Sequence, residues 1–330
     1  MLSLLFLILG FFLLYFGGEF LVKGSLGFSE KFSISKLVAG MTIVSFATSS
    51  PELFVSLEAI INKSSDIVFG NIIGSNIANI ALVLVCTALF FNIRISEKTL
   101  KIDYPFLFFA TISVGYILYF LGAITFFTGL ILLIILSAYL FYIITSSRKE
   151  IKEEISEKAL KEAKKIGEVL TDENYEENIS YTRCFVYLIS GIILLKYGAD
   201  FLVSSAIEIA SLLNIEERVI AVTIIAIGTS VPELATSIVA ALKKEVDLAV
   251  GNIVGSNIFN LLAVLGVTAI YKDLDIMNDK ILSSDYFLMI VVTIIFGILM
   301  YTFGKGKINR LKGGVLLLIY FSYIYYSIIN

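Results

Sequence analysis

Long apolar stretches separated by short polar segments run through this chain and predict membrane-spanning helices. Each stretch has roughly 20 residues, the length that an α-helix needs to cross the hydrocarbon core of a bilayer. Most charged residues lie between the stretches. The pattern predicts ten spans, at about residues 2–22, 37–61, 67–91, 103–121, 125–145, 184–206, 219–242, 248–270, 286–304 and 313–329. The expected fold class is therefore an all-α polytopic membrane protein with ten transmembrane helices.

The second half of the chain repeats the first. The segment Ala47–Leu53 (ATSSPEL) returns as Gly228–Leu234 (GTSVPEL), and Gly70–Asn79 (GNIIGSNIAN) returns as Gly251–Asn260 (GNIVGSNIFN). Both copies lie 181 positions further on, an offset that holds without a gap from Leu13 to Leu89. Because five spans per half is an odd number, the second half must enter the membrane in the opposite orientation. We therefore expect two inverted five-helix repeats, an architecture common among secondary transporters.

A polar stretch between the two halves divides the chain into three parts. We expect a five-helix unit at residues 1–145, a charged loop at 146–182 and a second five-helix unit at 183–330. The loops after the odd-numbered spans carry 20 of the 25 Lys and Arg residues, and loops rich in these residues stay on the cytoplasmic side. The expected localisation is the cell membrane, with the central loop cytoplasmic and both termini outside.

Composition narrows the range of chemistry. Hydrophobic residues make up 58% of the chain and the mean hydropathy is +0.92, as a membrane protein requires. The absence of histidine excludes His-ligated zinc or copper and Ser-His catalysis. The two cysteines lie far apart and support neither a disulfide framework nor a metal cluster. The formal net charge of −3 indicates no nucleic-acid partner.

Two of the three prolines, Pro51 and Pro232, occupy matching positions inside predicted spans 2 and 7. Proline removes one backbone hydrogen bond from a helix and clashes with the preceding turn. In lipid, the freed carbonyls need partners in protein, water or a bound ion. Spans 2 and 7 are therefore expected to be broken near mid-membrane and to present carbonyls such as those of Ser45 and Ala226. A simple helix kink is the alternative explanation.

A glutamate follows each of these prolines, Glu52 and Glu233, and a carboxylate near the bilayer centre costs at least ~2.5 kcal/mol. Hydroxyl and amide residues lie at helical spacing around both glutamates. They are Thr48, Ser49, Thr229 and Ser230 on spans 2 and 7, and Ser75, Asn79, Ser256 and Asn260 on spans 3 and 8. Oxygen donors without sulfur or imidazole are typical of sites for hard cations such as Ca²⁺ and Na⁺. A protein that changes sides only when these carboxylates are neutralised by cations is an exchanger, although a channel would use the same oxygens.

Other charged residues within or near the spans include Glu19, Glu58, Asp200 and Lys196. Glu19 and Asp200 match each other in the repeat, near the ends of spans 1 and 6. They either guide cations to the site or pair with neighbouring loops, and we favour the structural role. Lys196 lies within span 6 and has no basic counterpart in the repeat.

The paired motifs, (A/G)TS-x-PEL followed by GN-I-x-GSN-I-x-N, resemble the repeats of prokaryotic sodium/calcium exchangers of the Ca²⁺/cation antiporter superfamily. The resemblance covers both repeats and the ten-span layout. It implies Ca²⁺ and Na⁺ positions between spans 2, 3, 7 and 8, while spans 1 and 6 slide against this core. The ligands that it implies are carboxylates of Glu52 and Glu233, carbonyl and hydroxyl oxygens of Thr48 and Thr229, hydroxyls of Ser49 and Ser230 for Na⁺, carbonyls of Ser45 and Ala226 for the outer Na⁺ positions, and side chains of Ser75, Asn79, Ser256 and Asn260.

The function that the resemblance implies is secondary active antiport of Na⁺ against Ca²⁺, electrogenic and extruding Ca²⁺, and not an enzymatic activity. H⁺/Ca²⁺ antiport is the alternative within transport, since a glutamate accepts a proton as readily as it binds a cation. A cation channel and an intramembrane hydrolase are alternatives from other classes. No cofactor is expected beyond the transported ions, and no obligate protein partner is evident besides the lipid bilayer.

Overall fold

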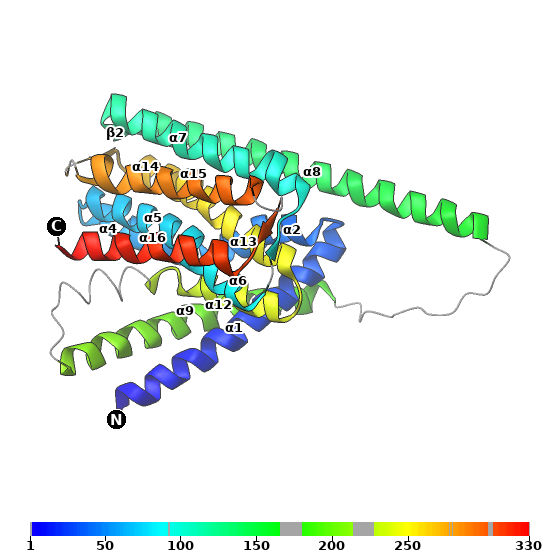
Figure 1. Ribbon diagram of the computed structural model, residues 1–330, viewed down its shortest axis with the longest axis horizontal. Coiled ribbons are helices and arrows are strands. Elements are labelled where there is room, and N and C mark those ends of the chain that lie inside the picture. Colours follow the sequence, from blue (N-terminus) through cyan, green and yellow to red (C-terminus); the bar gives the residue numbers. More distant parts are fainter. Residues whose placement is uncertain are drawn as a thin grey trace.

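The computed structural model describes residues 2–91, 93–165, 180–213, 228–276, 278, 280–302 and 306–329, and this part of the protein is a bundle of helices (Figure 1). The first half contains α1 (Leu2–Phe32), α2 (Lys36–Ala39), η1 (Gly40–Val44), α3 (Ser45–Thr48), α4 (Ser50–Ile61), α5 (Ser65–Ala78), η2 (Asn79–Val83), α6 (Leu84–Phe90), β1 (Ile93–Arg94), η3 (Thr99–Asp103), α7 (Tyr104–Leu121), β2 (Ala123–Ile124) and α8 (Phe126–Lys165). The second half contains α9 (Tyr181–Leu212), α12 (Val231–Leu242), α13 (Val246–Phe259), η5 (Asn260–Val264), α14 (Leu265–Tyr271), β3 (Leu274–Asp275), η6 (Ile281–Tyr286), α15 (Phe287–Tyr301), β4 (Lys307–Ile308) and α16 (Arg310–Ile329). The η segments are π-helical turns.

The described helices confirm an all-α polytopic membrane fold. Seven of them are long and apolar enough to cross a bilayer, and the bent pair Lys36–Thr48 and Ser50–Ile61 makes up to eight. The count of ten spans stays a prediction, and residues 219–227 of the seventh predicted span lie outside the described part. α8 continues without a break into the predicted central loop and is helical through Lys165.

The second predicted span is interrupted where its proline predicts. α3 ends at Thr48, α4 begins at Ser50 with Pro51 in its first turn, and the two helices are bent by 40° relative to each other. Ser49, at the break, has φ −81° and ψ 1°. Its repeat partner Ser230, just before α12, has φ −88° and ψ 1°. The same local sequence therefore produces the same turn in both halves.

Glycines spaced seven residues apart bring α1 and α9 into backbone contact. A Cβ atom at Gly191 would lie 2.7 Å from the backbone nitrogen of Leu21, and one at Gly198 would lie 2.8 Å from that of Leu14. Small residues at such positions let membrane helices approach closely. α1 and α9 consequently lie side by side at one edge of the bundle (Figure 1).

Reciprocal contacts join the two halves. β1 pairs antiparallel with β4, and β2 pairs antiparallel with β3, so each small ladder takes one strand from each half. The Tyr104 hydroxyl donates a hydrogen bond to the Thr293 carbonyl (3.1 Å), and the Tyr286 hydroxyl donates to the Thr111 carbonyl (2.7 Å). The two tyrosines stand 182 positions apart, and so do the two threonines. The repeat therefore extends into predicted spans 4 and 9 with one added residue.

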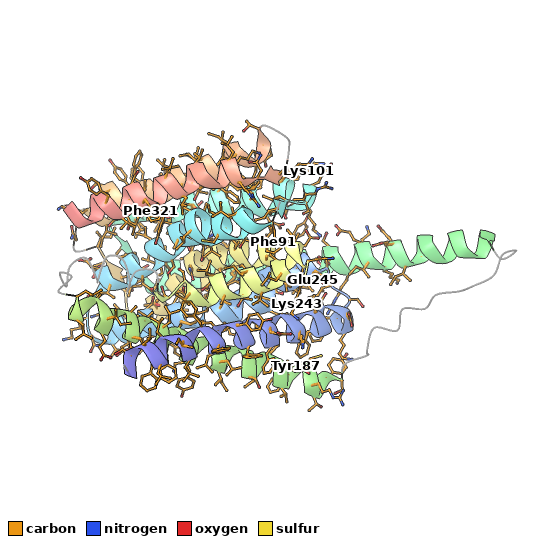
Figure 2. The ribbon with its side chains drawn as sticks, turned by 60° about the horizontal axis from the view of Figure 1, so that its bottom comes forward. Phe91, Lys101, Tyr187, Lys243, Glu245 and Phe321 are labelled. Atoms are coloured by element: carbon orange, nitrogen blue, oxygen red, sulfur yellow. The ribbon has the colours of Figure 1, made fainter. Side chains whose placement is uncertain are left out.

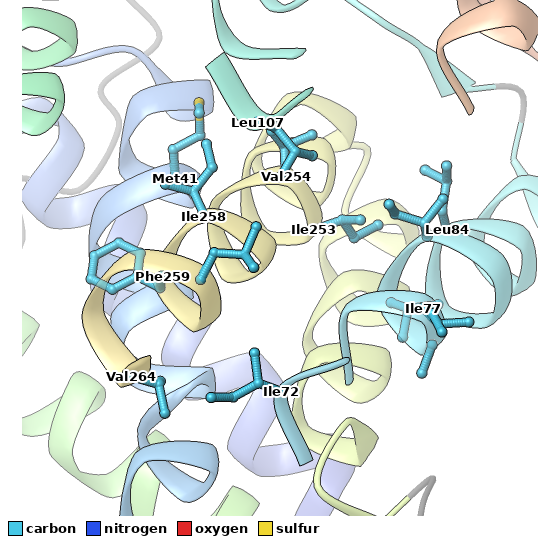
Figure 3. Close-up of a cluster of buried hydrophobic side chains, with 14 of the residues drawn as sticks. Met41, Ile72, Ile77, Leu84, Leu107, Ile253, Val254, Ile258, Phe259 and Val264 are labelled. Atoms are coloured by element: carbon cyan, nitrogen blue, oxygen red, sulfur yellow. The ribbon is translucent and has the colours of Figure 1, made fainter. Parts of the chain in front are cut away.

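The apolar core lies around α5 and α13, the helices that carry the repeated asparagine motifs. Every residue of α13 from Leu248 to Phe259 is buried. Figure 3 shows Ile72 and Ile77 of α5 with Ile253 and Ile258 of α13 in this cluster. Because the surrounding helices shield them from lipid, these two segments can hold polar side chains at the centre of the bundle.

The two ends of the bundle differ in their surroundings. Both chain termini lie at one end, and α8 extends beyond the other (Figure 1). Lys101 and Lys243 lie toward the end from which α8 extends, and Phe321 lies toward the opposite end (Figure 2). This arrangement agrees with the predicted segregation of basic residues, whereas the sidedness relative to the cell stays a prediction.

Candidate cation-binding site

Four short segments bring the predicted site residues into the buried centre. They are the α3–α4 break, the turn before α12, the α5–η2 junction and the α13–η5 junction. The side chains of Ser45, Thr48, Ser49, Glu52, Ser75, Asn79, Ser230, Glu233, Ser256 and Asn260 are all buried, none more than 3% exposed. Thr229 is half-buried, and Ala226 lies outside the described residues. The predicted residues thus come from both repeats.

Hydroxyl contacts cross from one repeat to the other in matching pairs. The Thr48 hydroxyl donates to Oδ1 of Asn252 (3.0 Å) and lies 3.3 Å from the Ser256 hydroxyl. Reciprocally, the Ser75 hydroxyl lies 3.0 Å from the Thr229 hydroxyl. Thr48 and Thr229 are repeat partners, and so are Ser75 and Ser256. The broken helix of each half is therefore held against the third span of the other half.

Two asparagines that were not predicted as site residues position the glutamate-bearing helices. The side-chain amide of Asn71 donates to the Ser56 hydroxyl (3.0 Å) and to the backbone carbonyl of Glu52 (3.0 Å). In the other half, the amide of Asn252 donates to the Ser237 hydroxyl (3.2 Å). A signal was present in the sequence, because each asparagine is the second residue of a repeated Gly-Asn motif.

The two carboxylates are fully buried without a hydrogen-bond partner. Both side-chain oxygens of Glu52 and of Glu233 lack a partner among the described residues, as do the hydroxyls of Ser49 and Ser230 and the Oδ1 atom of Asn260. Buried polar atoms are normally paired, because leaving one unsatisfied costs roughly 1–3 kcal/mol, and more for a charged group. Unpartnered oxygens gathered in one buried region fit residues that bind a cation.

The electrostatics of the site point the same way. The negative charge of Glu52 acts on Glu233, and the Thr48 hydroxyl is near the Glu233 carboxylate. The Ser75 hydroxyl is near the Glu52 carboxylate. Two carboxylates that repel each other in a dry environment are stabilised by a cation between them. When both are ionised, one divalent ion or two monovalent ions would balance their combined charge of −2.

A π-helical turn begins at each of the paired asparagines, η2 at Asn79 and η5 at Asn260. Single π turns inside α-helices are frequent at functional sites. The Asn260 amide donates to Oδ1 of Asn76 (3.1 Å), whereas neither polar atom of the Asn79 side chain has a partner among the described residues. The two halves therefore differ in detail here, despite identical residues.

The helix break does not free the Ser45 carbonyl, contrary to the expectation from the sequence. That carbonyl accepts a hydrogen bond from the Ser49 amide (2.9 Å). Because Pro51 lacks an N–H group, the carbonyl deprived of its usual donor is that of Ala47, four residues earlier. The Thr48 hydroxyl also lies 3.5 Å from this carbonyl, but its shorter hydrogen bond goes to Asn252 (3.0 Å). A carbonyl has a second lone pair, so Ser45 stays a candidate ligand.

The ligand types available are carboxylates, hydroxyls, amides and carbonyls. Among the described residues, no three or more His, Cys, Asp or Glu side chains gather into a group. An all-oxygen set with two carboxylates suits a hard cation and not zinc or copper.

A cavity of about 210 Å³ reaches the site from one side. It lies between α9 and the proline-bearing starts of α4 and α12, and its lining includes Pro51, Pro232 and Thr229. From α9, the lining includes Lys196 and Asp200. A larger cavity of about 750 Å³ between α7 and α15 is mostly apolar and includes none of the candidate ligands.

Among the described residues, α1 and α12 are in close contact on the repeat-related side. A Cβ atom at Gly18 of α1 would lie 3.1 Å from Cγ2 of Val239 on α12. Next to this contact, the Glu19 carboxylate pairs with Lys243 (2.9 Å) and with Lys23 (3.2 Å). Glu19 is the repeat partner of Asp200, so equivalent positions lie in a sealed contact on one side and beside a cavity on the other.

Comparison with known proteins places these features in a family. The family described as sodium/calcium exchanger protein matches residues 2–145 and 184–329. The Alkalimonas amylolytica protein CaxA, whose name describes an antiporter, is 34% identical over 97% of each chain. The sodium/calcium exchanger MaX1 of Methanosarcina acetivorans is 27% identical, over 98% of this chain and 97% of MaX1. A solved structure of the sodium-calcium exchanger NCX_Mj superimposes with a TM-score of 0.79 at 27% identity, covering 98% of each chain.

Proposed function

The chain belongs to the sodium/calcium exchanger protein family, and we propose that it is a secondary antiporter that exchanges Na⁺ for Ca²⁺ across the cell membrane by alternating access. Membership of a membrane-transporter family confirms the resemblance seen in the sequence and supports Ca²⁺ and Na⁺ as its substrates. The coupling ion, the direction of transport and the ligands are parts of the proposal.

The observation that carries the proposal is the set of buried, unpartnered oxygens contributed by both repeats. The proposed common ligands are the carboxylates of Glu52 and Glu233, which Ca²⁺ would neutralise. The hydroxyls of Ser49 and Ser230, equally unpartnered, are proposed to bind Na⁺. The further ligands proposed are Thr48, Thr229, Ser75, Ser256, Asn79, Asn260 and the carbonyls of Ser45 and Ala226. If more than two Na⁺ ions replace one Ca²⁺, the exchange moves net charge and is electrogenic.

Alternating access is supported by the unequal approaches to the site. A cavity reaches Thr229 from the α9 side, while α1 is packed against α12 on the related side. We propose that the protein has ten spans in two inverted repeats, residues 1–145 and 183–330, joined by a cytoplasmic loop at 146–182. The reciprocal strand pairs β1–β4 and β2–β3 support this symmetry. On this topology the cavity opens to the outside, and we propose that Ca²⁺ is released there.

Two alternatives make different predictions. H⁺/Ca²⁺ antiport would use Glu52 and Glu233 as proton carriers, and no described lysine or arginine makes a hydrogen bond to either carboxylate. A channel needs a continuous water path, which the α1–α12 contact opposes.

Uptake of ⁴⁵Ca²⁺ into proteoliposomes loaded with Na⁺ and diluted into Na⁺-free medium tests the proposal. We expect uptake that requires internal Na⁺ and persists with a proton ionophore. Uptake driven by a pH gradient alone would establish proton coupling instead. Uptake with neither gradient would indicate a channel.

A further inference from the structure

Two opposite charges line the cavity that leads to the site. Lys196 and Asp200 stand four residues apart on α9 and therefore on the same helix face. Both side chains are exposed, and they are the charged side chains among the described residues of the cavity wall. Ser204, one further turn along α9, also lines the cavity. Thr229, a candidate ligand, lines the same cavity.

The repeat shows that this pair of charges is not imposed by symmetry. The partner of Lys196 on α1 is Tyr15, and the partner of Asp200 is Glu19. Glu19 is neutralised by Lys23 and Lys243 in the sealed α1–α12 contact. In the other copy of the repeat, the positions equivalent to these two lysines are occupied by Ser204 and Asn62, which carry no charge. Among the described residues, the lysines beside α1 are thus paired with Glu19, whereas Lys196 lines the cavity on the α9 side.

We propose that Lys196 and Asp200 set the electrostatic potential of this cavity, and that Lys196 makes it favour Na⁺ over Ca²⁺. The inference rests on the proposed function, in which both ions reach the site by this route. The local concentration of an ion depends exponentially on its charge multiplied by the potential. A potential that changes local Na⁺ by a given factor changes local Ca²⁺ by the square of that factor.

The cavity would therefore discriminate between Na⁺ and Ca²⁺ before either ion reaches the ligands. Lys196 lowers Ca²⁺ in the cavity more than it lowers Na⁺, which hinders rebinding of Ca²⁺ on the side where it is released. Asp200 acts in the opposite direction and keeps the cavity accessible to cations. Cavity walls of low dielectric constant make such charges act more strongly than on an open surface.

Charge-removing variants test the proposal by the sign and the ratio of their effects. In intact cells that express the chain, half-saturating external Ca²⁺ and Na⁺ are measured for Lys196→Gln and Asp200→Asn. We expect Lys196→Gln to lower both half-saturating concentrations. The factor by which the Ca²⁺ value falls should be the square of the factor for each bound Na⁺. Asp200→Asn should raise both values with the same relation. The matched control Lys272→Gln, on the same predicted side but outside the cavity, should change neither.

The rate at which charged thiol reagents label a cysteine in the cavity measures the electrostatic potential there and does not depend on transport. In a Ser204→Cys background, the labelling rates by positively and negatively charged membrane-impermeant methanethiosulfonates are compared from outside the cell. We expect Lys196→Gln to raise the ratio of cationic to anionic labelling and Asp200→Asn to lower it. Added choline chloride should reduce both changes, because salt screens charges that face water.

The outcomes separate the two claims. Three results would overturn the role of Lys196. They are equal changes in the half-saturating concentrations of Na⁺ and Ca²⁺, changes of the same sign in both variants, and labelling ratios that do not change. No labelling of Ser204→Cys from outside would overturn the outward opening of the cavity. Loss of Na⁺-dependent exchange in the unmodified protein would refute the proposed function, whereas the labelling ratio would still decide whether these charges set the potential.

Discussion

Replacing Glu52 with glutamine should weaken cation binding without weakening the fold. The Glu52 side chain is fully buried, and neither of its oxygens has a hydrogen-bond partner among the described residues. A charged side chain at the bilayer centre costs about 2.5–3.5 kcal/mol, and glutamine of nearly the same shape removes that charge. In ion-free buffer we therefore expect Glu52→Gln to unfold at the same temperature as the unmodified protein or higher.

Ca²⁺ should stabilise the unmodified protein and leave the variant unchanged. A ligand at about 100 times its dissociation constant stabilises the folded state by about 2.7 kcal/mol. For 330 residues, an unfolding entropy of about 2.1 cal/mol/K per residue converts this into a rise in Tm of about 4 °C. We expect this rise in the unmodified protein and its loss in Glu52→Gln, together with loss of ⁴⁵Ca²⁺ transport.

Thermal unfolding in detergent, with and without Ca²⁺, provides the assay. Glu58→Gln is the matched control, because Glu58 lies on the same helix with an exposed side chain. It should keep both the Ca²⁺-dependent rise and transport. If Glu52→Gln kept a Tm rise of about 4 °C and normal Ca²⁺ flux, Glu52 would not be a ligand and the site assignment would be wrong.

Three further substitutions have defined expectations. The double variant Ser49→Ala with Ser230→Ala should weaken the Na⁺ dependence of transport more than Ca²⁺ binding, and equal loss of both in flux titrations would contradict the separation of ligands. Lys243→Asn removes the ion pair with Glu19 (2.9 Å), a loss of about 1 kcal/mol or less. Amide hydrogen exchange in α1 around Glu19 should therefore increase, and unchanged exchange would show that the pair does not secure this contact. A Cβ atom added at Gly191 would lie only 2.7 Å from the Leu21 nitrogen, so Gly191→Val should lower Tm by several degrees. An unchanged Tm would show that α1 and α9 separate without cost.

Local chemistry explains what could be predicted from the sequence. Apolar stretches become helices because lipid offers no partners for backbone N–H and C=O groups, so each segment must satisfy its own. Pro51 predicts the break at Ser49 because a missing N–H acts within a single turn. The repeat predicts that both halves contribute equivalent oxygens, and the structure buries those that it describes, apart from the half-buried Thr229. Their role as ligands stays a prediction.

Other features depend on contacts between distant segments. The importance of Asn71 and Asn252 depends on which hydroxyl lies opposite each amide, and the exchange of Tyr104 and Tyr286 between halves depends on how the helices pack. The sequence treats Glu19 and Asp200 as equivalents, so pairing with neighbours was expected for both. The structure shows ion pairs for Glu19 and a cavity beside Asp200.

The sequence by itself thus determined the membrane class, the internal repeat, the helix break in span 2 and the family, because these follow from composition, local backbone chemistry and motif. Only the tertiary structure decided which approach to the site is closed. Two halves with matching sequence become unequal because α1 packs against α12 through Gly18, while α9 leaves a cavity beside α4. Close packing at one face of a shared core and a cavity at the other is a property of the whole bundle, which neither repeat encodes alone.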